Sequence, residues 1–256
     1  MMQFANVDGR RVEARPGSQG QCPLCDREVL SRCGEINAWH WAHKQRRDCD
    51  SWAEGESAWH RAWKERFPRQ WRELVVGSHR ADIKSPRGVI ELQASSISTS
   101  EVADREAFYG EMVWVLNAQD FDLTIRDRGS YVTFRWKHPR KTWWIAEKQL
   151  YFDLGEQLIK INRIYDNLPC GGSGSFLGYD KFVASFSQPK PGHKLCDQCW
   201  MPFASRQLIE TSMHEYYTMD LDPGTAMCPD CYESHREGFI PDDPSLFDCY
   251  TPVTIY

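Results

Sequence analysis

Residues 79–95 read HRADIKSPRGVIELQAS and combine two strand-like runs with a turn between them. The first run occupies 79–83, and the sequence Ser-Pro-Arg-Gly at 85–88 is typical of a tight turn. The second run, at 89–95, alternates apolar and polar side chains as a half-buried strand does. We therefore expect a β-hairpin within the central domain.

This hairpin carries two acidic side chains that can approach each other. Alternation places Glu91 and Gln93 on one face of their strand, and Asp82 lies on the neighbouring strand. Carboxylates without thiolates suit Mg²⁺ or Mn²⁺, which prefer oxygen ligands and retain several waters. The backbone carbonyl of Leu92 is a natural additional ligand. The pattern predicts a divalent metal site that can bind a phosphate and activate water.

The segments around the hairpin predict an α/β fold in which helices flank a mixed β-sheet. Trp59, Trp63 and Phe67 recur every four residues and predict a helix at about 54–67. A second helix is expected at about 99–111. Further strand-like runs lie at 72–76, 112–116, 131–136 and 158–164.

Polar residues on the first of these helices are candidates for the same site. Glu56, His60 and Lys64 are spaced four apart and therefore share one side of the helix. If the helix packs on the sheet, Glu56 can complete the metal site and His60 can transfer a proton. Lys64 can contact phosphate or supply the positive charge that Gln93 lacks. The alternative for such a Glu–Lys pair is an ordinary solvated helix face.

Composition favours a protein that stays in the cytoplasm. The 256 residues are 41% apolar, which is enough for a sizeable core. No window of about 18 uncharged apolar residues exists, and the N-terminal stretch lacks the apolar run of a signal peptide. We therefore expect no membrane partner, and cysteines that bind metal rather than form disulfides.

Charge is distributed unevenly along the chain. Residues 196–256 contain 2 basic and 11 acidic side chains and have a net charge of −9, whereas residues 1–195 have a net charge of +4. The larger part can approach a polyanion, and the C-terminal part should repel one. A protein partner is the alternative for the acidic C-terminal part.

Six of the ten cysteines form three C-x-x-C pairs, a pattern typical of zinc sites. Cys22 and Cys25 form the first pair, and tetrahedral Zn²⁺ needs two further ligands. The best candidates are His43 and Cys49, with His40 and Cys33 as alternatives. The C-terminal pairs complete a second set of four thiolates, Cys196, Cys199, Cys228 and Cys231. We expect two structural Zn²⁺ ions.

Two glycine-containing stretches have predicted roles. Asp8-Gly9 predicts the turn of a first β-hairpin, because both central turn positions need a positive φ. The sequence Gly-Gly-Ser-Gly-Ser at 171–175 is expected to be a flexible stretch.

Six short motifs occur in order at spacings that resemble those of the competence protein CoiA-like family. They are CPLC at 22–25, HWAH at 40–43, ESAWH at 56–60 followed by Trp63-Lys64, HRADI at 79–83, VIELQAS at 89–95 and WVL at 114–116. The resemblance extends to about residue 165. Together with the C-terminal cysteine pairs, which lie outside the resemblance, it predicts three domains: a hairpin with a zinc-ribbon-like module at 1–53, a nuclease-like domain at 54–188, and a Cys₄ zinc module at 189–256.

The resemblance further implies a nuclease domain of the PD-(D/E)XK type with a restriction-endonuclease-like core. Such a protein hydrolyses phosphodiester bonds, here in DNA, with RNA as an open alternative, and acts in DNA processing, recombination or defence. By position, Asp82 and Glu91 match metal ligands, and Gln93 stands where many enzymes of this type have lysine. Arg105 and Tyr109 also resemble the family pattern and are expected to touch backbone phosphates.

Three functions follow from these patterns. The first is an active Mg²⁺-dependent DNA nuclease. The second is a zinc protein that binds nucleic acid but has lost turnover, because glutamine at position 93 carries no charge. The third is a protein that recognises a partner through its acidic C-terminal module.

Overall fold

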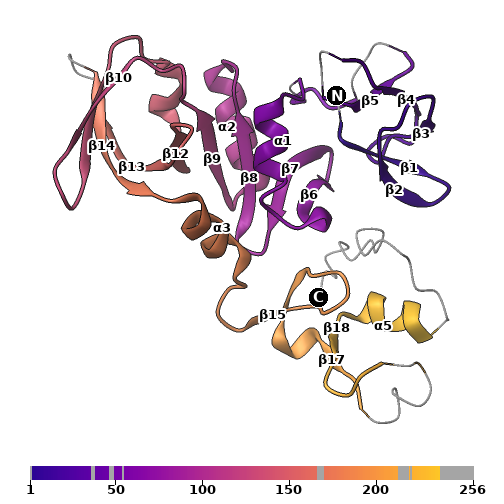
Figure 1. Cartoon of the computed structure of the whole chain (residues 1–256). Helices are drawn as coiled ribbons and strands as arrows, with labels where there is room; N and C mark the ends of the chain where they lie inside the picture. The colour runs from indigo at the N-terminus through magenta and orange to yellow at the C-terminus, as the bar shows by residue number, and fades with distance from the viewer. Residues whose placement is uncertain are drawn as a thin grey trace. The chain divides into compact units, whose positions relative to one another are not determined.

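The computed structural model of the chain describes residues 2–35, 38–45, 49–53, 55–165, 170–212, 219 and 221–236 (Figure 1). It comprises two compact units, the first made of Met1–Arg80 with Gln188–Tyr256 and the second of Ala81–Ser187. The three expected domains remain a prediction, because these units reflect packing within the chain and not sequence modules.

The N-terminal part of the first unit is a small antiparallel sheet with the strand order β2-β1-β3-β4-β5. Its strands are β1 Phe4–Val7, β2 Arg10–Glu13, β3 Gln19–Gln21, β4 Glu28–Arg32 and β5 His40–His43. Asp8 and Gly9 have φ angles of 51° and 76°, which confirms the predicted hairpin turn. Met2, Ala5, Val29 and Trp41 are buried together and form the core of this sheet.

The first unit continues with helix α1, Ala58–Lys64, a short 3₁₀ helix at Arg69–Trp71 and strand β6, Arg72–Val76. The helix is shorter than expected because Ser57 caps it: the Ser57 side chain accepts a hydrogen bond from the backbone N–H of His60. Trp63 and Phe67 are buried, as their spacing predicts.

The second unit is built on a mixed sheet in which the strands follow the order β10-β11-β14-β13-β12-β9-β8-β7 (Figure 1). The strands are β7 His79–Ser85, β8 Gly88–Gln93, β9 Met112–Asn117, β10 Leu123–Asp127, β11 Val132–Trp136, β12 Gln149–Asp153, β13 Leu158–Tyr165 and β14 Gly171–Leu177. Strand β9 pairs in parallel with β8 and β12, whereas β7 with β8, β12 with β13, β13 with β14, β14 with β11 and β11 with β10 pair antiparallel. The expected mixed α/β architecture is therefore present.

Helical segments cover both faces of this sheet. Helix α2, Thr99–Tyr109, is capped by Ser98 and lies on the face of Trp114, whose indole N–H donates to Glu106 Oε1 over 2.9 Å. The 3₁₀ helix Lys141–Ile145 covers the same face. Helix α3, Tyr179–Ser187, packs its Phe182 against Tyr151 on the opposite face.

The glycine-rich stretch at 171–175 is not a loop, and the prediction of a flexible stretch was wrong. It begins strand β14, which pairs with β11 and β13. A Cβ atom on Gly171 would collide with the carbonyl oxygen of Phe134, and one on Gly172 with that of Arg163. Glycine is used here because neighbouring backbone approaches too closely for a side chain.

The C-terminal part of the first unit consists of short elements. They are β15 His193–Leu195, β16 Pro202–Ala204, a 3₁₀ helix at Ser205–Gln207, β17 Ile209–Glu210, β18 Ala226–Met227 and helix α5 Pro229–Arg236. In the part of the chain that the structure describes, no helix is long and apolar enough to cross a membrane.

Candidate functional site

Asp82 and Glu91 are brought together by strands β7 and β8. Ile83 is paired with Ile90, so Asp82 lies opposite Glu91 in the continuing register. The Asp82 N–H donates to Glu91 Oε1 over 3.4 Å, and the Leu92 N–H donates to Asp82 Oδ2 over 2.9 Å. Asp82 is half-buried, whereas Glu91 is only 3% exposed. The hairpin therefore presents one accessible and one buried carboxylate.

The buried position makes ionisation of Glu91 costly. Burial and the adjacent Asp82 carboxylate raise the pKa of Glu91 to about 8, although Arg105 acts in the opposite direction. Arg105 Nη1 lies 2.9 Å from Glu91 Oε2, and its Nη2 lies 2.5 Å from Glu101 Oε1. A cation placed between Asp82 and Glu91 would relieve their repulsion.

Gln93 lies next to this pair on the same face of β8 and is also buried. Its Nε2 atom donates to the backbone oxygen of Ser95 over 3.3 Å. The amide has no charge to offer a phosphate, but it can orient a ligand by hydrogen bonding.

The structure corrects the expected environment of Arg105. The sequence prediction placed Arg105 and Tyr109 at backbone phosphates, but Arg105 is 3% exposed and binds Glu91 and Glu101. It is therefore a neighbour of the candidate metal ligands and not a surface group. Tyr109 is half-buried, and its contact with phosphate remains a prediction. Glu101 was missed, although its position four residues before Arg105 is a recognisable helix pairing signal.

Lys64 occupies a buried ion-pair cluster within the first unit. Its Nζ atom lies 2.6 Å from Glu56 Oε2 and 2.6 Å from Glu73 Oε1, and its side chain is 0% exposed. The predicted contact of Lys64 with phosphate is therefore not available in this arrangement. His60 is buried and its Nδ1 lies 2.8 Å from Ser57 Oγ. Catalytic roles for Glu56 and His60 remain predictions.

Glu73 was not recognised in the sequence as part of this cluster. Its Oε2 atom accepts the backbone N–H of Gln3 over 2.7 Å, so one carboxylate links the residue before strand β1 to helix α1. Its φ of 47° is unusual for a residue other than glycine. Burial opposes its ionisation, but Lys64 and Arg80 lower the pKa of Glu73 to about 2. The sequence signal for Glu73 was an acidic residue directly before the apolar run Leu-Val-Val at 74–76 of a predicted strand.

We expect Lys64→Met to destabilise the protein strongly. Removing the ammonium leaves Glu56 and Glu73 as uncompensated buried carboxylates, which costs about 3–5 kcal/mol of unfolding free energy. Urea denaturation at pH 7 measures the loss, and Lys44→Met, at an exposed lysine, serves as the control. Because folding lowers the pKa of Glu73, the ionised Glu73 stabilises the folded protein above about pH 4.5, and this stabilisation is lost as the pH falls toward 2. Equal stability of Lys64→Met and Lys44→Met would contradict the cluster's role.

Cys22, Cys25, His43 and Cys49 form the first thiol-rich cluster. One potential ligand atom from each residue lies within 4.8 Å of the others. Cys22 Sγ lies 3.6 Å from Cys49 Sγ, and Cys25 Sγ lies 3.2 Å from His43 Nε2. The alternatives His40 and Cys33 are not among these four. Three sulfurs and one imidazole could hold zinc, which favours four such ligands in a tetrahedral arrangement.

Cys196, Cys199, Cys228 and Cys231 form the second cluster, and all four are buried. The Cys228 N–H donates to Cys196 Sγ over 3.3 Å, and the two C-x-x-C corners are joined by hydrogen bonds between Asp197 and Ala226. With four sulfurs present, this cluster could also hold zinc. A filled tetrahedral shell leaves no open position for catalysis.

The first corner of each cluster has the same local backbone geometry. Cys22 N–H donates to the Arg27 carbonyl over 2.9 Å, and Cys196 N–H donates to the Met201 carbonyl over 2.9 Å. The residue after the second cysteine has a positive φ in both corners, 55° at Asp26 and 59° at Trp200. Two segments far apart in sequence therefore fold their cysteine pairs into the same turn.

The thiols of the clusters differ in their ease of ionisation. Burial raises the pKa of Cys22, and burial together with Cys22 raises the pKa of Cys49 to about 12. At Cys25, burial is outweighed by hydrogen bonds from Arg27 and His43, which lower the pKa to about 6. A hydrogen bond with Cys199 lowers the pKa of Cys196 to about 7. Each cluster thus contains one thiol that ionises more readily than an ordinary cysteine.

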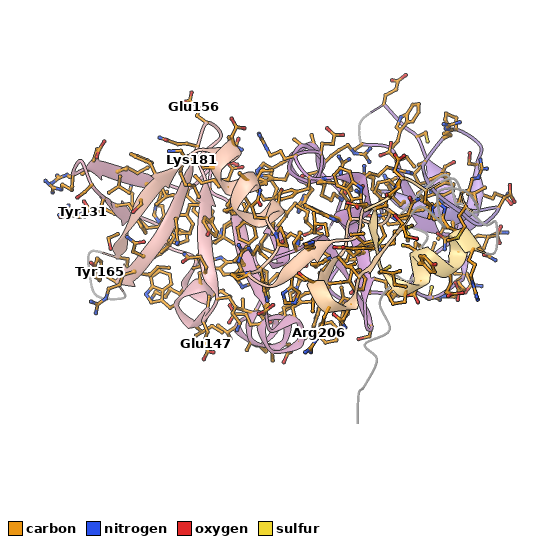
Figure 2. The ribbon with its side chains drawn as sticks, turned by 90° about the horizontal axis from the view of Figure 1, so that it is seen from below. Tyr131, Glu147, Glu156, Tyr165, Lys181 and Arg206 are labelled. Atoms are coloured by element: carbon orange, nitrogen blue, oxygen red, sulfur yellow. The ribbon has the colours of Figure 1, made fainter. Side chains whose placement is uncertain are left out.

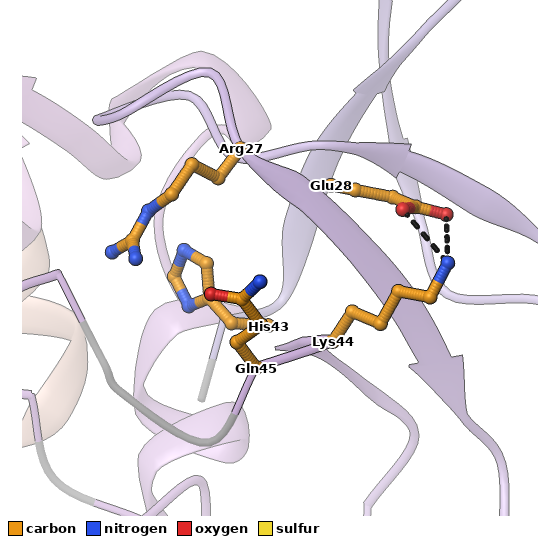
Figure 3. A pocket seen from close by; sticks show the side chains of 5 residues that line it. All are labelled: Arg27, Glu28, His43, Lys44 and Gln45. Carbon is orange, nitrogen blue, oxygen red and sulfur yellow. Dashed lines mark hydrogen bonds and ion pairs between the residues drawn. The ribbon is translucent and has the colours of Figure 1, made fainter.

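A pocket that shares His43 with the first cluster is lined by Arg27, Glu28, His43, Lys44 and Gln45 (Figure 3). Lys44 Nζ lies 3.0 Å from Glu28 Oε2, so its charge is already balanced there. Arg27 Nε donates to Cys25 Sγ over 3.4 Å. Of the two basic residues of the pocket, Lys44 therefore forms an ion pair and Arg27 contacts the thiol-rich cluster.

Comparison with known proteins identifies the N-terminal segment. Residues 10–51 match the family described as competence protein CoiA, N-terminal domain, and this range contains all four residues of the first cluster. No curated protein and no solved structure matches the chain. Strands β2 to β5, with the thiol-rich cluster that they support, are therefore similar to the N-terminal domain of the competence protein CoiA.

Proposed function

We propose that this protein is a metal-dependent nuclease that hydrolyses phosphodiester bonds in DNA, with Asp82 and Glu91 as its metal ligands. The observation that carries this proposal is the opposition of the two carboxylates on β7 and β8, one of them buried. Similarity of residues 10–51 to the CoiA N-terminal domain supports a competence-related role in DNA processing. Recombination and defence belong to the same proposal.

The residues at this site fit Mg²⁺ or Mn²⁺ by their chemistry. Asp82 and Glu91 offer oxygen atoms, as does the Leu92 carbonyl, and these cations prefer oxygen ligands. Mg²⁺ usually binds few protein groups and keeps several waters, so two carboxylates suffice. When bound, such an ion polarises a phosphate and lowers the pKa of bound water.

The chain's own residues would orient the ligands and exclude water. Arg105 holds Glu91 Oε2 at 2.9 Å and leaves Glu91 Oε1 directed to the Asp82 backbone. The side chain of Asp82 is fixed by the Leu92 N–H. Gln93 would orient water or a phosphate oxygen by hydrogen bonding. Because Gln93 carries no charge, the proposal relies on the metal for charge neutralisation.

A substrate panel tests the proposal directly. Labelled single-stranded, double-stranded and branched DNA, together with RNA, is incubated with the full chain, with and without Mg²⁺ or Mn²⁺. We expect cleavage only when the divalent cation is present. The proposal fails if none of these substrates is cut under any of the metal conditions.

Arg105 is expected to act as a positioning residue. Arg105→Gln removes the ion pair with Glu91 and should reduce cleavage by about 10-fold or more and raise the half-saturating Mg²⁺ concentration. Arg105→Lys retains the charge but not the two-pronged contact with Glu91 and Glu101, so it should restore part of the activity. An unchanged Mg²⁺ requirement in Arg105→Gln would show that Arg105 has only a structural role.

A nucleic-acid-binding zinc protein without turnover is the second candidate. It is favoured by Gln93 in the position where many enzymes of the PD-(D/E)XK type have lysine, and by Arg105 already paired with Glu91. This candidate predicts salt-sensitive binding that survives Glu91→Ala without metal-dependent cleavage. Recognition of a protein by the acidic C-terminal module remains a further prediction.

A further inference from the structure

One face of the mixed sheet in the second unit carries a group of cations at the end of the sheet formed by β10, β11, β14 and β13. Strands β10, β11, β14 and β13 are neighbours in this order. Their exposed basic side chains on this face are Arg126, Arg135, Lys160 and Arg163. We call this surface the basic sheet face.

Strand register places these cations on the same face. Arg126 is opposite Thr133, Thr133 is opposite Ser173, and Ser173 is opposite Arg163. Directly opposed residues of neighbouring strands project to the same side of a sheet. Arg126 and Arg163 therefore lie at the two ends of one row that crosses four strands, about 14 Å apart at about 4.8 Å per strand.

The adjacent row adds another cation and an aromatic ring. Arg135 is opposite Gly171, and Gly171 is opposite Tyr165. The Arg163 guanidinium lies 5.5 Å from the centre of the Tyr165 ring. Figure 2 shows Tyr165 at the same end of the unit as Tyr131, at the left of the view. The ring is exposed, so the row presents an aromatic surface beside positive charge.

The alternating side chains of these strands form the opposite face, which is apolar. Phe134 and Trp136 of β11 are buried there and contact Phe152 of β12. On the basic sheet face, by contrast, the four cations of β10, β11 and β13 are exposed to solvent. Helix α3 packs on Tyr151 of β12, at the inner side of the same face.

Charge and shape distinguish this face from an ordinary solvated surface. On β10, β11, β13 and β14, all of which the structure describes, no acidic side chain projects to this side. Between the basic strands, β14 contributes the small residues Gly171, Ser173 and Ser175 to this face, and Leu177 follows at the end of the strand. The surface therefore contains cations on both sides of a low central strand, which leaves space for an extended ligand.

We propose that the basic sheet face binds the phosphodiester backbone of a nucleic acid. Charge complementarity selects this occupant, because a polyanion has closely spaced charges and can contact several of the four cations at once. The choice of nucleic acid rests on the proposed function. Glu91 projects to the other face of the sheet, so this surface is separate from the candidate metal site. Tyr165 can stack on an unpaired base, which predicts tighter binding of single strands than of duplexes.

Fluorescence anisotropy of the full chain tests this surface. The probes are labelled 30-nucleotide single-stranded DNA, its duplex and the corresponding RNA, in buffer without Mg²⁺ or Mn²⁺ and without chelator. Arg135→Gln/Arg163→Gln should weaken binding by about 10-fold. It should also reduce the magnitude of the negative slope of log affinity against log salt by about 2. Replacing all four cations by glutamine should reduce the magnitude of that slope by about 3–4.

The matched control is Lys141→Gln/Lys181→Gln, which removes two exposed charges from helical segments of the same unit. It should bind nearly as the unaltered chain does. Equal weakening in this control, or unchanged affinity and salt slope in the four-site variant, overturns the inference. Cleavage is measured separately with Mg²⁺. If the unaltered chain never cuts DNA but the four-site variant binds poorly, the proposed nuclease activity is refuted and the proposed binding surface is not. Retained binding in an active four-site variant refutes the surface alone.

Discussion

Asp82→Asn is expected to lower the rate of metal-dependent cleavage by at least about 100-fold. The substitution preserves the size of the side chain and leaves an oxygen able to accept the Leu92 N–H. It removes one of two charges available to a divalent cation, and each tenfold loss in rate corresponds to about 1.4 kcal/mol of transition-state stabilisation. The measurement is the initial rate on the best substrate at several Mg²⁺ concentrations.

The matched control for this experiment is Asp104→Asn. Asp104 is an exposed carboxylate on helix α2, so its replacement removes the same charge away from the hairpin. Its cleavage rate should stay within about twofold of the unaltered chain. Full activity in Asp82→Asn, or equal losses in both variants, would refute the assignment of Asp82 as a metal ligand.

The second large effect is expected at the C-terminal cluster. The unaltered chain should contain two zinc ions, and Cys228→Ser should contain about one, because serine does not replace a thiolate in the second cluster. Structural zinc supplies about 10–16 kcal/mol of binding free energy in small domains, which is more than most domains have as folding stability. The C-terminal part should therefore become sensitive to protease.

Zinc content by elemental analysis and limited proteolysis measure these outcomes. Cys33→Ser is the control, since Cys33 belongs to neither cluster, and it should retain two zinc ions and normal protease resistance. Two zinc ions in Cys228→Ser would contradict the assignment. A decrease in Cys33→Ser would indicate that Cys33 takes part in binding.

Local patterns in the sequence were sufficient for much of the fold. Alternation predicted strand β8, helical spacing predicted α1, and Asp8-Gly9 predicted the first hairpin turn. These features depend on residues close together in the chain, where side-chain period and φ preference act directly. Residues 171–175 did not follow their composition, because the requirement for glycine in β14 comes from the backbone of other strands.

The candidate sites show the same division between local and distant information. The three C-x-x-C corners and the Asp82–Glu91 hairpin were recognisable because each is made by nearby residues. The environment of Lys64 was not: Glu73 lies nine residues away and captures its ammonium in a buried cluster. Arg105 was likewise expected at the surface, but packing of α2 on the sheet directs it to Glu91.

By itself, the sequence predicted that Asp82 and Glu91 lie on adjacent strands. It also predicted two candidate zinc sites, one at Cys22 and Cys25 with further ligands left open and one at four C-terminal cysteines. Only the tertiary structure decided that Glu91 is buried beside Arg105, and that four cations from three strands share one open face. The physical reason is that strand order and helix packing depend on contacts between distant segments. The charge and pKa of each group are then set by neighbours that local pattern does not reveal.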